Sequence, residues 1–289
     1  MRIAELFARG APVFSFEFFP PKTDAGYQSL YEAIGELKRL GPGFVSVTCG
    51  AAGSTRKKTA ELVVRIQAEL GLTAMAHVVC TGTTQDELAE SLAWMRSRGV
   101  ENVLALRGDA PRDQPEWRPV PGGFHHANEL AAFLRARFDF CIGGACYPEK
   151  HPEAASFEED LRQLKRKVDA GAQFLITQLF FDAADYWRFV ERARSAGIVV
   201  PIVPGVMPVV SGANLRRMAT LSPGSKIPAA LQQELDDAGD DDERALAAGV
   251  RFATDQCREL LARGAPGIHF YTLNRSPATR RVHEAVSRR

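Results

Sequence analysis

The strongest constraint on the fold of this chain is a regular alternation of short strand-like segments with longer helix-like segments. The strand-like segments are rich in β-branched and aromatic residues and lie at 13–18, 44–48, 73–79, 102–107, 140–147, 174–180, 199–203 and 267–271. Apolar residues at helical spacing occur at 26–40, 57–70, 84–98, 126–137, 157–170, 183–196, 213–221, 228–236, 241–263 and 278–286. Eight strands in this alternation predict an α/β protein with the (β/α)8 TIM-type barrel fold, in which residues 1–289 form a single domain.

An open, doubly wound sheet is the alternative fold for the same alternation. Such a sheet usually carries a glycine-rich, phosphate-binding turn after its first strand. Here the corresponding turn is Phe19-Pro20-Pro21-Lys22, which contains no glycine. The barrel is therefore favoured, and a ligand site is expected where the carboxyl ends of its strands meet.

The composition bears on the partners of the chain. Lys and Arg number 36 and Asp and Glu 35, so the net charge of +1 gives no reason to expect nucleic acid or an acidic membrane. A small molecule, or another copy of the chain in a homo-oligomer, is the expected partner. The sequence shows no secretory signal and no apolar run as long as a membrane span, which predicts a soluble cytoplasmic protein. The five cysteines form no C-x-x-C pair and are expected to be reduced.

One carboxylate, Glu17, lies within an aromatic run that two prolines terminate. In a strand, Glu17 shares a face with Val13 and Ser15, whereas the phenylalanines at 14, 16 and 18 face the opposite side, toward helices. Loss of hydration among aromatic rings would raise the pKa of Glu17, so it is expected to donate a proton near neutral pH. A structural salt bridge is the other interpretation of a single Glu at a strand end.

Polar residues occupy most of the expected strand ends. The set comprises Glu17, Thr48, His77, Arg107 with Asp109, Tyr147, Gln178 and Tyr271. A sealed core would not select them, because an unpaired buried polar group costs roughly 1–3 kcal/mol. Each residue alone is compatible with a structural role, but together they predict a ligand cavity.

Metal and nucleotide motifs add little to this hypothesis. The histidines at 77, 151 and 269 have no recognisable metal-ligand spacing, so no metal is expected. The chain has no G-x-G-x-x-G motif and no P-loop, so barrel loops would have to hold any nucleotide. Arg107 and the run Lys165-Arg166-Lys167 are candidates for binding phosphate, although the run also has the pattern of a solvated helix face.

A series of short motifs runs in order along nearly the whole chain. They are FEFFPPK at 16–22, SVT at 46–48, ALRGD at 105–109, YPE at 147–149 with HPE at 151–153, LKRK at 164–167 with DAGA at 169–172, ITQ at 176–178 and HFYTLNR at 269–275. In this combination they resemble the 5,10-methylenetetrahydrofolate reductase family of the bacterial type. The resemblance implies an FAD-binding barrel that takes hydride from NADH or NADPH and passes it to 5,10-methylenetetrahydrofolate, giving 5-methyltetrahydrofolate.

The resemblance also implies roles for single residues. Glu17 matches the general acid of the family, which protonates N5 of the folate, and Asp109 matches a catalytic carboxylate near the flavin that also contacts the pterin. Flavin contacts are matched by Thr48, His77, Arg107, Gly108, Asp109, Tyr147, His151, Asp160 and Lys167. Folate-binding positions are matched by Glu17, Asp109, Gln178 and Arg275, and Met218 stands where the family has an aromatic residue that stacks on the substrate.

Two departures from the family pattern affect the expected site. Cys49 replaces an aromatic residue after Thr48, and residues 211–221 contain no aromatic side chain, which leaves the Met218 thioether to pack against the substrate. Two alternative functions stay open at this point. One is a folate-binding barrel of the methyltransferase type without redox chemistry, and the other is a flavin-binding partner subunit with no activity of its own.

The proline- and glycine-rich loop at 110–123 carries Trp117 and is followed by Phe124. A solvated loop has little reason to carry such large apolar groups. One hypothesis is that either ring covers the substrate as a lid that excludes water. Packing against a barrel helix or a second subunit is the other interpretation.

Overall fold

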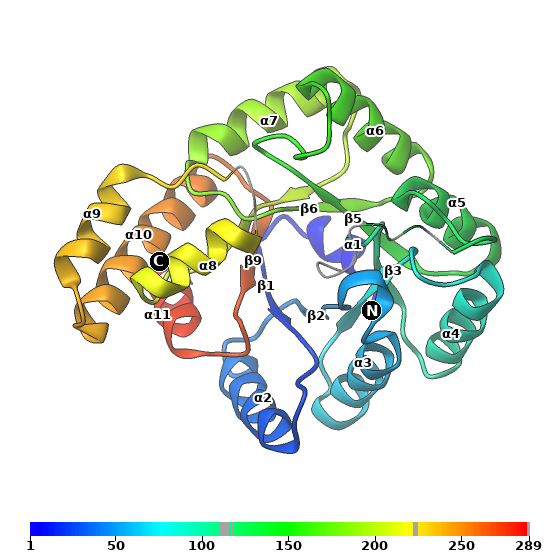
Figure 1. Cartoon of the computed structure of the whole chain (residues 1–289), viewed down its shortest axis with the longest axis horizontal. Helices are drawn as coiled ribbons and strands as arrows, with labels where there is room; N and C mark the ends of the chain where they lie inside the picture. Colours follow the sequence, from blue (N-terminus) through cyan, green and yellow to red (C-terminus); the bar gives the residue numbers. More distant parts are fainter. Residues whose placement is uncertain (110–115, 117, 119, 222–224, 288–289) are drawn as a thin grey trace.

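The computed structural model of the chain describes residues 1–109, 116, 118, 120–221 and 225–287. A single parallel sheet lies at its centre and is surrounded by helices (Figure 1). The strands are β1 (Val13–Phe18), β2 (Phe44–Val47), β3 (Ala74–Val79), β4 (Asn102–Leu106), β5 (Cys141–Cys146), β6 (Phe174–Thr177), β7 (Ile202–Val203), β8 (Gly205–Val206) and β9 (Gly267–Tyr271). Their order in the sheet is β7-β6-β5-β4-β3-β2-β1-β9-β8, so the first strand lies beside the last.

Two short strands, β7 and β8, share one position of the barrel. Only Pro204 separates them, and β7 pairs with β6 while β8 pairs with β9. Pro204 interrupts the strand because it has no N–H to donate, but its carbonyl accepts the His269 N–H at 2.9 Å. The nine strand segments therefore occupy eight positions, and the predicted (β/α)8 barrel is confirmed over an open, doubly wound sheet.

The helices form a ring outside the sheet (Figure 1). They are α2 (Asp24–Lys38), α3 (Arg56–Leu70), α4 (Gln85–Ser97), α5 (Ala127–Arg137), α6 (Phe157–Asp169), α7 (Ala183–Ser195), α8 (Gly212–Leu221), α9 (Ala229–Ala238), α10 (Asp242–Ala262) and α11 (Pro277–Ser287). All the helices expected from the sequence are present, with ends that differ by a few residues from the expectation. Three of them, α8 to α10, follow β8 in the chain and precede β9.

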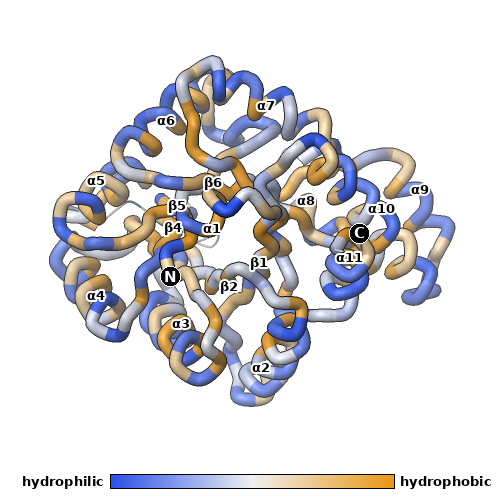
Figure 2. The backbone as a smooth tube through the Cα atoms, turned by 180° about the vertical axis from the view of Figure 1, so that it is seen from behind, coloured by the Kyte–Doolittle hydropathy of each residue, from blue (hydrophilic) through white to orange (hydrophobic). Residues whose placement is uncertain are grey.

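One helix and one turn were not predicted from the sequence. The turn is the 3-10 helix η1 (Ala51–Gly53), and the helix is α1 (Ile3–Phe7), which lies at the centre of the ring of helices (Figures 1 and 2). The Ile3 N–H donates to Asn102 Oδ1 at 2.8 Å, and the Phe7 ring lies 5.7 Å from that of Phe174. A five-residue helix is not stable alone, so these distant contacts define it, and it covers the amino end of the barrel.

Burial follows the two faces of the strands. The largest apolar cluster packs the outer faces of the strands against the helices and includes Phe16 and Phe18, both fully buried. A second cluster fills the amino half of the barrel interior and includes Phe44 and Phe174. In the view from behind, the central strands are largely hydrophobic, whereas the surrounding helices alternate between polar and apolar residues (Figure 2). The alternation predicted for β1, with phenylalanines outside and Glu17 inside, is confirmed.

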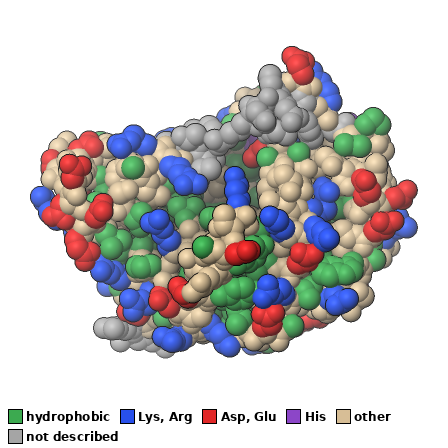
Figure 3. Space-filling model, turned by 60° about the horizontal axis from the view of Figure 1, so that its bottom comes forward, with side chains coloured by type: hydrophobic (Ala, Val, Ile, Leu, Met, Phe, Trp, Pro, Cys, Tyr) green, Lys and Arg blue, Asp and Glu red, His purple; other side chains and the backbone are tan. Residues whose placement is uncertain are grey.

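The surface has a mixed character. On the face shown in Figure 3, basic and acidic side chains are interspersed with hydrophobic ones, so this face presents no surface of a single sign. None of the helices in the described part of the chain is both long and apolar enough to cross a bilayer. All five cysteines are free thiols; four are buried and Cys49 is half-buried.

The two lid candidates differ in what the structure says of them. Trp117 lies outside the described residues. Phe124 is 9% exposed, and its ring packs edge-on against Phe133 of α5, with centroids 5.1 Å apart. For Phe124, the structure favours packing against a barrel helix.

Candidate active site

Glu17 lies at the carboxyl end of β1, with its side chain inside the barrel. The pairing of the strands places it beside Ser46 of β2 and Tyr271 of β9. Its side chain is 16% exposed, at the boundary between the apolar interior and the open end of the barrel. Two prolines follow shortly after it and end the strand, because proline cannot continue a central ladder.

Two histidines approach the Glu17 carboxylate from other strands. Oε2 of Glu17 lies 3.3 Å from Nε2 of His77 in β3 and 3.4 Å from Nε2 of His269 in β9. The Ser46 hydroxyl donates to the same oxygen at 3.5 Å, and Ser15 Oγ lies 2.7 Å from Nδ1 of His269. These five residues form a buried polar group of side chains, which we call the Glu17 cluster.

This cluster shifts the pKa of Glu17 in the direction opposite to the expectation. Burial raises the pKa of the carboxyl group, but the charge and close approach of His77 and the hydrogen bond with His269 outweigh burial and lower the pKa to about 2. The prediction of a raised pKa was therefore wrong. The phenylalanines that suggested it point away on the other face of β1, whereas the groups facing the carboxylate favour its charged form.

His77 has an unusual position within the cluster. Its Nε2 atom is inaccessible to solvent and makes no hydrogen bond to the described residues, since its contact with Glu17 lacks hydrogen-bond geometry. Buried polar atoms in native proteins are nearly always hydrogen-bonded. This nitrogen is thus a place where a bound ligand or a small movement of Glu17 would supply the missing partner.

Three members of the cluster were not identified from the sequence as site residues, namely Ser15, Ser46 and His269. The signal for His269 was present in the period of the strand, because residues 269 and 271 share a face and Tyr271 was placed at the open end. The register that sets Ser15 opposite His269 was not predictable, since it depends on the stagger of the closed barrel.

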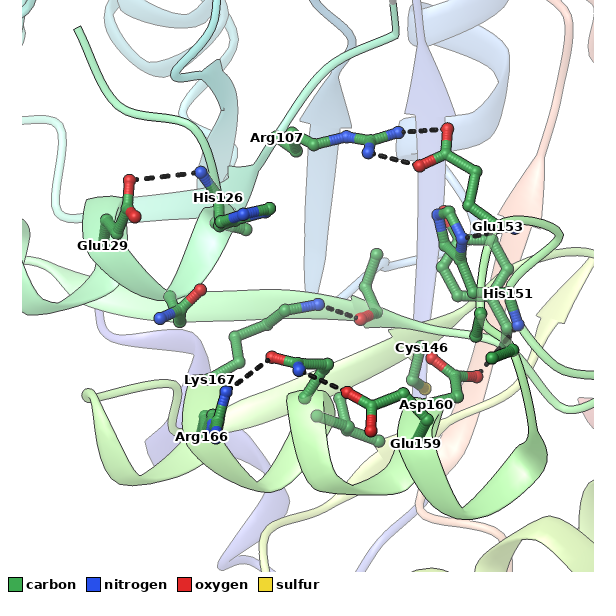
Figure 4. Close-up of a pocket in the computed structure, with 18 residues that line it drawn as sticks. Arg107, His126, Glu129, Cys146, His151, Glu153, Glu159, Asp160, Arg166 and Lys167 are labelled. Carbon is green, nitrogen blue, oxygen red and sulfur yellow. Dashed lines mark hydrogen bonds and ion pairs between the residues drawn. The ribbon is translucent and has the colours of Figure 1, made fainter.

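A cavity of about 620 Å³ lies at the same end of the barrel, between the ends of β4 and β5 and the helices α5 and α6 (Figure 4). Its volume falls within the range of roughly 300–1,000 Å³ that is usual for small-molecule sites. Its lining includes Arg107, Tyr147, His151, Asp160 and Lys167. The structure thus brings these predicted cofactor-binding residues together around one space.

Arg107 crosses the cavity to meet a carboxylate (Figure 4). Its two terminal nitrogens donate to the two oxygens of Glu153 at 2.5 and 2.7 Å. This forked pairing raises the pKa of Arg107 and lowers that of Glu153, so both stay charged. Glu153 was part of a sequence motif but was not predicted as a site residue.

The basic run on α6 divides between surface and cavity. Lys165 pairs with Asp169 at 2.5 Å on the outside of the helix, as a solvated face would. Lys167 instead points into the cavity, where its ammonium donates to the Ala145 carbonyl at 2.7 Å and burial lowers its pKa. An ammonium has three N–H donors, and Ala145 is the one acceptor that Lys167 meets within the described residues. A bound anion would satisfy the others.

The loop after β5 supplies the opposite wall. The His151 N–H donates to Asp160 Oδ2 at 2.9 Å, and the rings of Tyr147 and His151 meet edge-on with centroids 4.6 Å apart. Burial raises the pKa of Asp160 and lowers that of His151. Burial, followed by the nearby charge of Asp109, raises the pKa of Tyr147 to about 12. This wall therefore carries polar groups that can form hydrogen bonds.

The turn after β4 carries two further predicted residues, Gly108 and Asp109, at the rim of the barrel, meaning the edge of its open end. Gly108 has φ +88, and a Cβ there would lie 2.2 Å from Cγ1 of Val79, so the turn requires glycine. Asp109 follows with an exposed side chain, and its carbonyl accepts the Ala52 N–H at 3.1 Å. Thr48, half-buried just beyond β2, also lies at this end of the barrel.

Tyr271 links the Glu17 cluster to the next strands. Its hydroxyl donates to the Thr177 carbonyl at 2.6 Å, and its ring packs edge-on against His269 at 5.4 Å. Burial, together with the charge of Glu17, raises the pKa of Tyr271. Gln178, directly after β6, folds its side-chain oxygen back onto the Leu179 N–H at 3.0 Å.

The two remaining predicted residues differ in exposure. Arg275 is exposed in the turn after β9. Met218 is only 1% exposed and lies in an apolar cluster with Leu179, Leu215 and Leu231. A thioether buried in this way has no surface to offer a substrate, so the location of Met218 does not support the predicted contact.

These features define a class of protein: a (β/α)8 barrel with a polar site at the carboxyl ends of its strands, where barrel enzymes carry their catalytic residues. A family model described as methylenetetrahydrofolate reductase matches residues 2–287. The chain therefore belongs to the methylenetetrahydrofolate reductase family, as its motifs predicted.

Similar proteins have been described in bacteria and plants. The 5,10-methylenetetrahydrofolate reductase of Escherichia coli is 41% identical over 264 residues, which cover 91% of this chain and 86% of that protein. Methylenetetrahydrofolate reductase (NADH) 1 of Arabidopsis thaliana is 41% identical over 284 residues, which cover 94% of this chain and 48% of that protein. The chain thus spans about half the length of its plant relatives.

A solved structure shares the fold at low sequence identity. It is described as an uncharacterized protein from Clostridium thermocellum that binds two copies of 5-methyl-5,6,7,8-tetrahydrofolic acid. The match has a TM-score of 0.67 at 15% identity and covers 99% of this chain and 98% of the other. At this identity the likeness concerns the fold alone.

Proposed function

We propose that the chain reduces 5,10-methylenetetrahydrofolate to 5-methyltetrahydrofolate, with FAD as its bound cofactor and NADH or NADPH as the hydride donor. Membership of the family supports this function. The observation that carries it is the Glu17 carboxylate held between the imidazoles of His77 and His269 at the open end of the barrel. A proton-donating group is what the folate half of this reaction needs, because N5 must be protonated for the imidazolidine ring to open.

The cavity beside α6 suits the polar groups of FAD. Lys167 offers N–H donors that meet no acceptor among the described residues beyond the Ala145 carbonyl, and Arg107, whose fork holds Glu153, adds a positive charge for a phosphate. Asp160 and Tyr147 line the cavity and offer hydrogen bonds to hydroxyl groups. When bound, FAD supplies the hydride chemistry. The protein then contributes binding, orientation and charge.

The lowered pKa of Glu17 favours its charged form, so Glu17 must acquire a proton before it can protonate the folate. The hydrogen bond of 3.4 Å between Nε2 of His269 and Oε2 of Glu17 gives a path by which a proton can pass from the imidazole to the carboxylate, and Nε2 of His77 lies 3.3 Å from the same oxygen. An approaching basic nitrogen would draw that proton through Glu17. In this arrangement Glu17 faces the substrate, and the two imidazoles set its charge.

The substrate-binding side chains are proposed to be Asp109, Gln178 and Arg275, which lie in the turns after β4, β6 and β9. Turns at the carboxyl ends of different strands surround one opening in this fold. Met218 is left out of this group because it is buried among leucines.

The test is a pair of half-reactions followed by flavin absorbance under anaerobic conditions. The purified protein, incubated with FAD and freed of excess, should show flavin bands that NADH or NADPH bleaches and 5,10-methylenetetrahydrofolate restores, with 5-methyltetrahydrofolate as the product. A protein that binds folate but no flavin would instead indicate a methyltransferase-type barrel. A flavin that folate fails to reoxidise would leave a binding subunit without activity.

A further inference from the structure

The ladder between β1 and β9 continues beyond its last backbone pair through side chains. The backbone register of the two strands ends with Glu17 opposite Tyr271. Thr272, the residue directly after β9, donates its hydroxyl to the Glu17 carbonyl at 2.6 Å. The same hydroxyl oxygen accepts the Asn274 N–H at 3.1 Å. The turn after β9 is thus tied directly to the backbone of Glu17.

The side chain of Asn274 binds the backbone of Phe19, the residue directly after β1. Its Oδ1 accepts the Phe19 N–H at 2.9 Å, and its Nδ2 donates to the Phe19 carbonyl at 2.9 Å. The amide therefore pairs with both polar groups of one residue, as a neighbouring strand would. Because Pro20 and Pro21 follow, no backbone ladder can extend past this point.

The turn adopts an unfavourable backbone in order to present this amide. Leu273 and Asn274 have φ angles of +51° and +58°, the left-handed region that most side chains avoid. Such conformations persist where the surrounding structure enforces them, and they cluster at functional sites. The turn also carries Arg275 at its exposed end.

The clamped residue, Phe19, is itself unusual. It is 39% exposed, one of the few large apolar side chains of the described residues that are not covered. Phe18 is fully buried at the end of β1, and Phe19 follows it directly, two residues after Glu17 in the chain. An uncovered aromatic ring at the open end of the barrel is suited to lie against a flat apolar ring of a ligand.

We propose that Asn274 is a positioning residue that fixes the Glu17 carboxylate and the Phe19 ring against the folate substrate. This inference rests on the proposed function and adds to it a group that touches neither substrate nor cofactor. The physical argument is that Glu17 and Phe19 lie at the end of a strand that two prolines cut short. Without the amide of Asn274, the Phe19 backbone has no hydrogen-bond partner among the described residues, and the backbone that carries Glu17 keeps only the Thr272 hydroxyl as a tie to the turn after β9.

The chain offers a matched control at the other end of the barrel. Asn102 also clamps a backbone in both directions, with Oδ1 accepting the Ile3 N–H at 2.8 Å and Nδ2 donating to the Met1 carbonyl at 3.0 Å. It is 1% exposed and fixes α1, far from the Glu17 cluster. Asn102→Ala therefore removes a similar clamp without touching the site.

The experiment compares Asn274→Gly, Asn274→Ala and Asn102→Ala with the wild type in both half-reactions. Glycine accepts the left-handed backbone and removes only the amide, so it separates the clamp from the strain of the turn. Asn274→Gly should slow the folate half-reaction by about 10- to 100-fold, because a misplacement of about 1 Å can cost that much. Reduction of the flavin by the nicotinamide should not change. Asn102→Ala should lower the melting temperature and leave both half-reactions as they are.

A second measurement reads the position of Glu17 without turnover. Nitrogen chemical shifts of the His77 and His269 imidazoles report on the carboxylate between them, and they should move in Asn274→Gly but not in Asn102→Ala. Unchanged shifts, or an Asn274→Gly variant with an unaffected folate half-reaction, would overturn the positioning role. A wild type that reduces no folate at all would instead overturn the proposed function, and the imidazole shifts would still decide the role of Asn274.

Discussion

The two ends of the barrel interior are built from the same strands but differ in chemistry. At the amino end, β2 and β3 contribute Phe44 and Met75, both fully buried, and α1 covers them. Two residues further along the same strands and on the same face come Ser46 and His77. A shift of two residues, about 7 Å along a strand, replaces an apolar packing layer by a polar cluster in which His77 Nε2 has no hydrogen-bond partner among the described residues.

This difference shows how the fold separates stability from function. The amino end gains free energy from closely packed apolar side chains, whereas the carboxyl end holds a carboxylate and two imidazoles that a purely stabilising interior would exclude. Substitutions at the amino end should therefore change stability with little effect on rates. Substitutions at the carboxyl end should mainly change reaction rates.

Among the tests of this difference between the two ends, Glu17→Gln has the largest expected effect, which is on the rate of folate reduction. Glutamine keeps the shape of the side chain but cannot transfer a proton, so folate reduction should fall by about 10² to 10⁴, the usual contribution of general acid catalysis. Reduction of the flavin by the nicotinamide should persist. Stopped-flow absorbance separates the two half-reactions, and equal damage to both would contradict the assignment of Glu17.

Phe174→Ala tests the amino end. The side chain is fully buried against Phe7 and Phe44, and its loss should lower the free energy of unfolding by roughly 3–5 kcal/mol. Rates per folded molecule should stay at the wild-type level. Denaturant titration gives the stability, and Phe174→Leu, which keeps most of the volume, serves as the control. A large loss of kcat in folded Phe174→Ala would show that the two ends are not separate.

Asp109→Asn tests the rim with a smaller expected effect. A carboxylate beside the flavin opposes its anionic reduced form, so the variant flavin should be easier to reduce and folate affinity should change with it. Asp109 is exposed, which limits the effect through solvent screening to about tenfold at most, or about 30 mV for a two-electron couple. Dye equilibration measures the potential. An unchanged value would place Asp109 away from the flavin ring.

A last test is the pH dependence of stability that Glu17 confers. The folded protein lowers the pKa of Glu17 from its ordinary value of 4.5 to about 2, so its charged form is favoured by folding. That contribution is complete above about pH 4.5 and disappears as the pH falls toward about 2. The difference in unfolding free energy between wild type and Glu17→Gln should shrink over this interval. The difference in unfolding free energy between wild type and Phe174→Leu should not shrink over this pH interval.

Much of the fold was predictable because it depends on local patterns. The hydrophobic period predicted the strands and helices, and their alternation predicted the barrel. What the sequence did not predict depends on distant contacts. Helix α1 exists because Asn102 and Phe174 hold it, and the seventh strand is divided because Pro204 falls within it.

The site was predictable to the extent that it follows from strand ends and family motifs. His77 does lie against Glu17, and Arg107, Tyr147, His151, Asp160 and Lys167 do line one cavity. The pKa of Glu17 was predicted in the wrong direction because neighbours in sequence were taken for neighbours in space. Only the closed barrel brings His77 and His269 to the carboxylate. The homo-oligomer and the cytoplasmic location stay predictions.

The docking of α1 has a consequence for the order in which the chain folds. Ile3 pairs with a residue 99 positions later, and Phe7 packs against Phe174, beyond the middle of the sequence. During synthesis this segment leaves the ribosome long before its binding surface exists, and a single turn of helix does not persist on its own. Contacts so distant in sequence are slow to form. The amino end of the barrel is therefore closed late in folding, by a segment that is made long before Asn102 and Phe174.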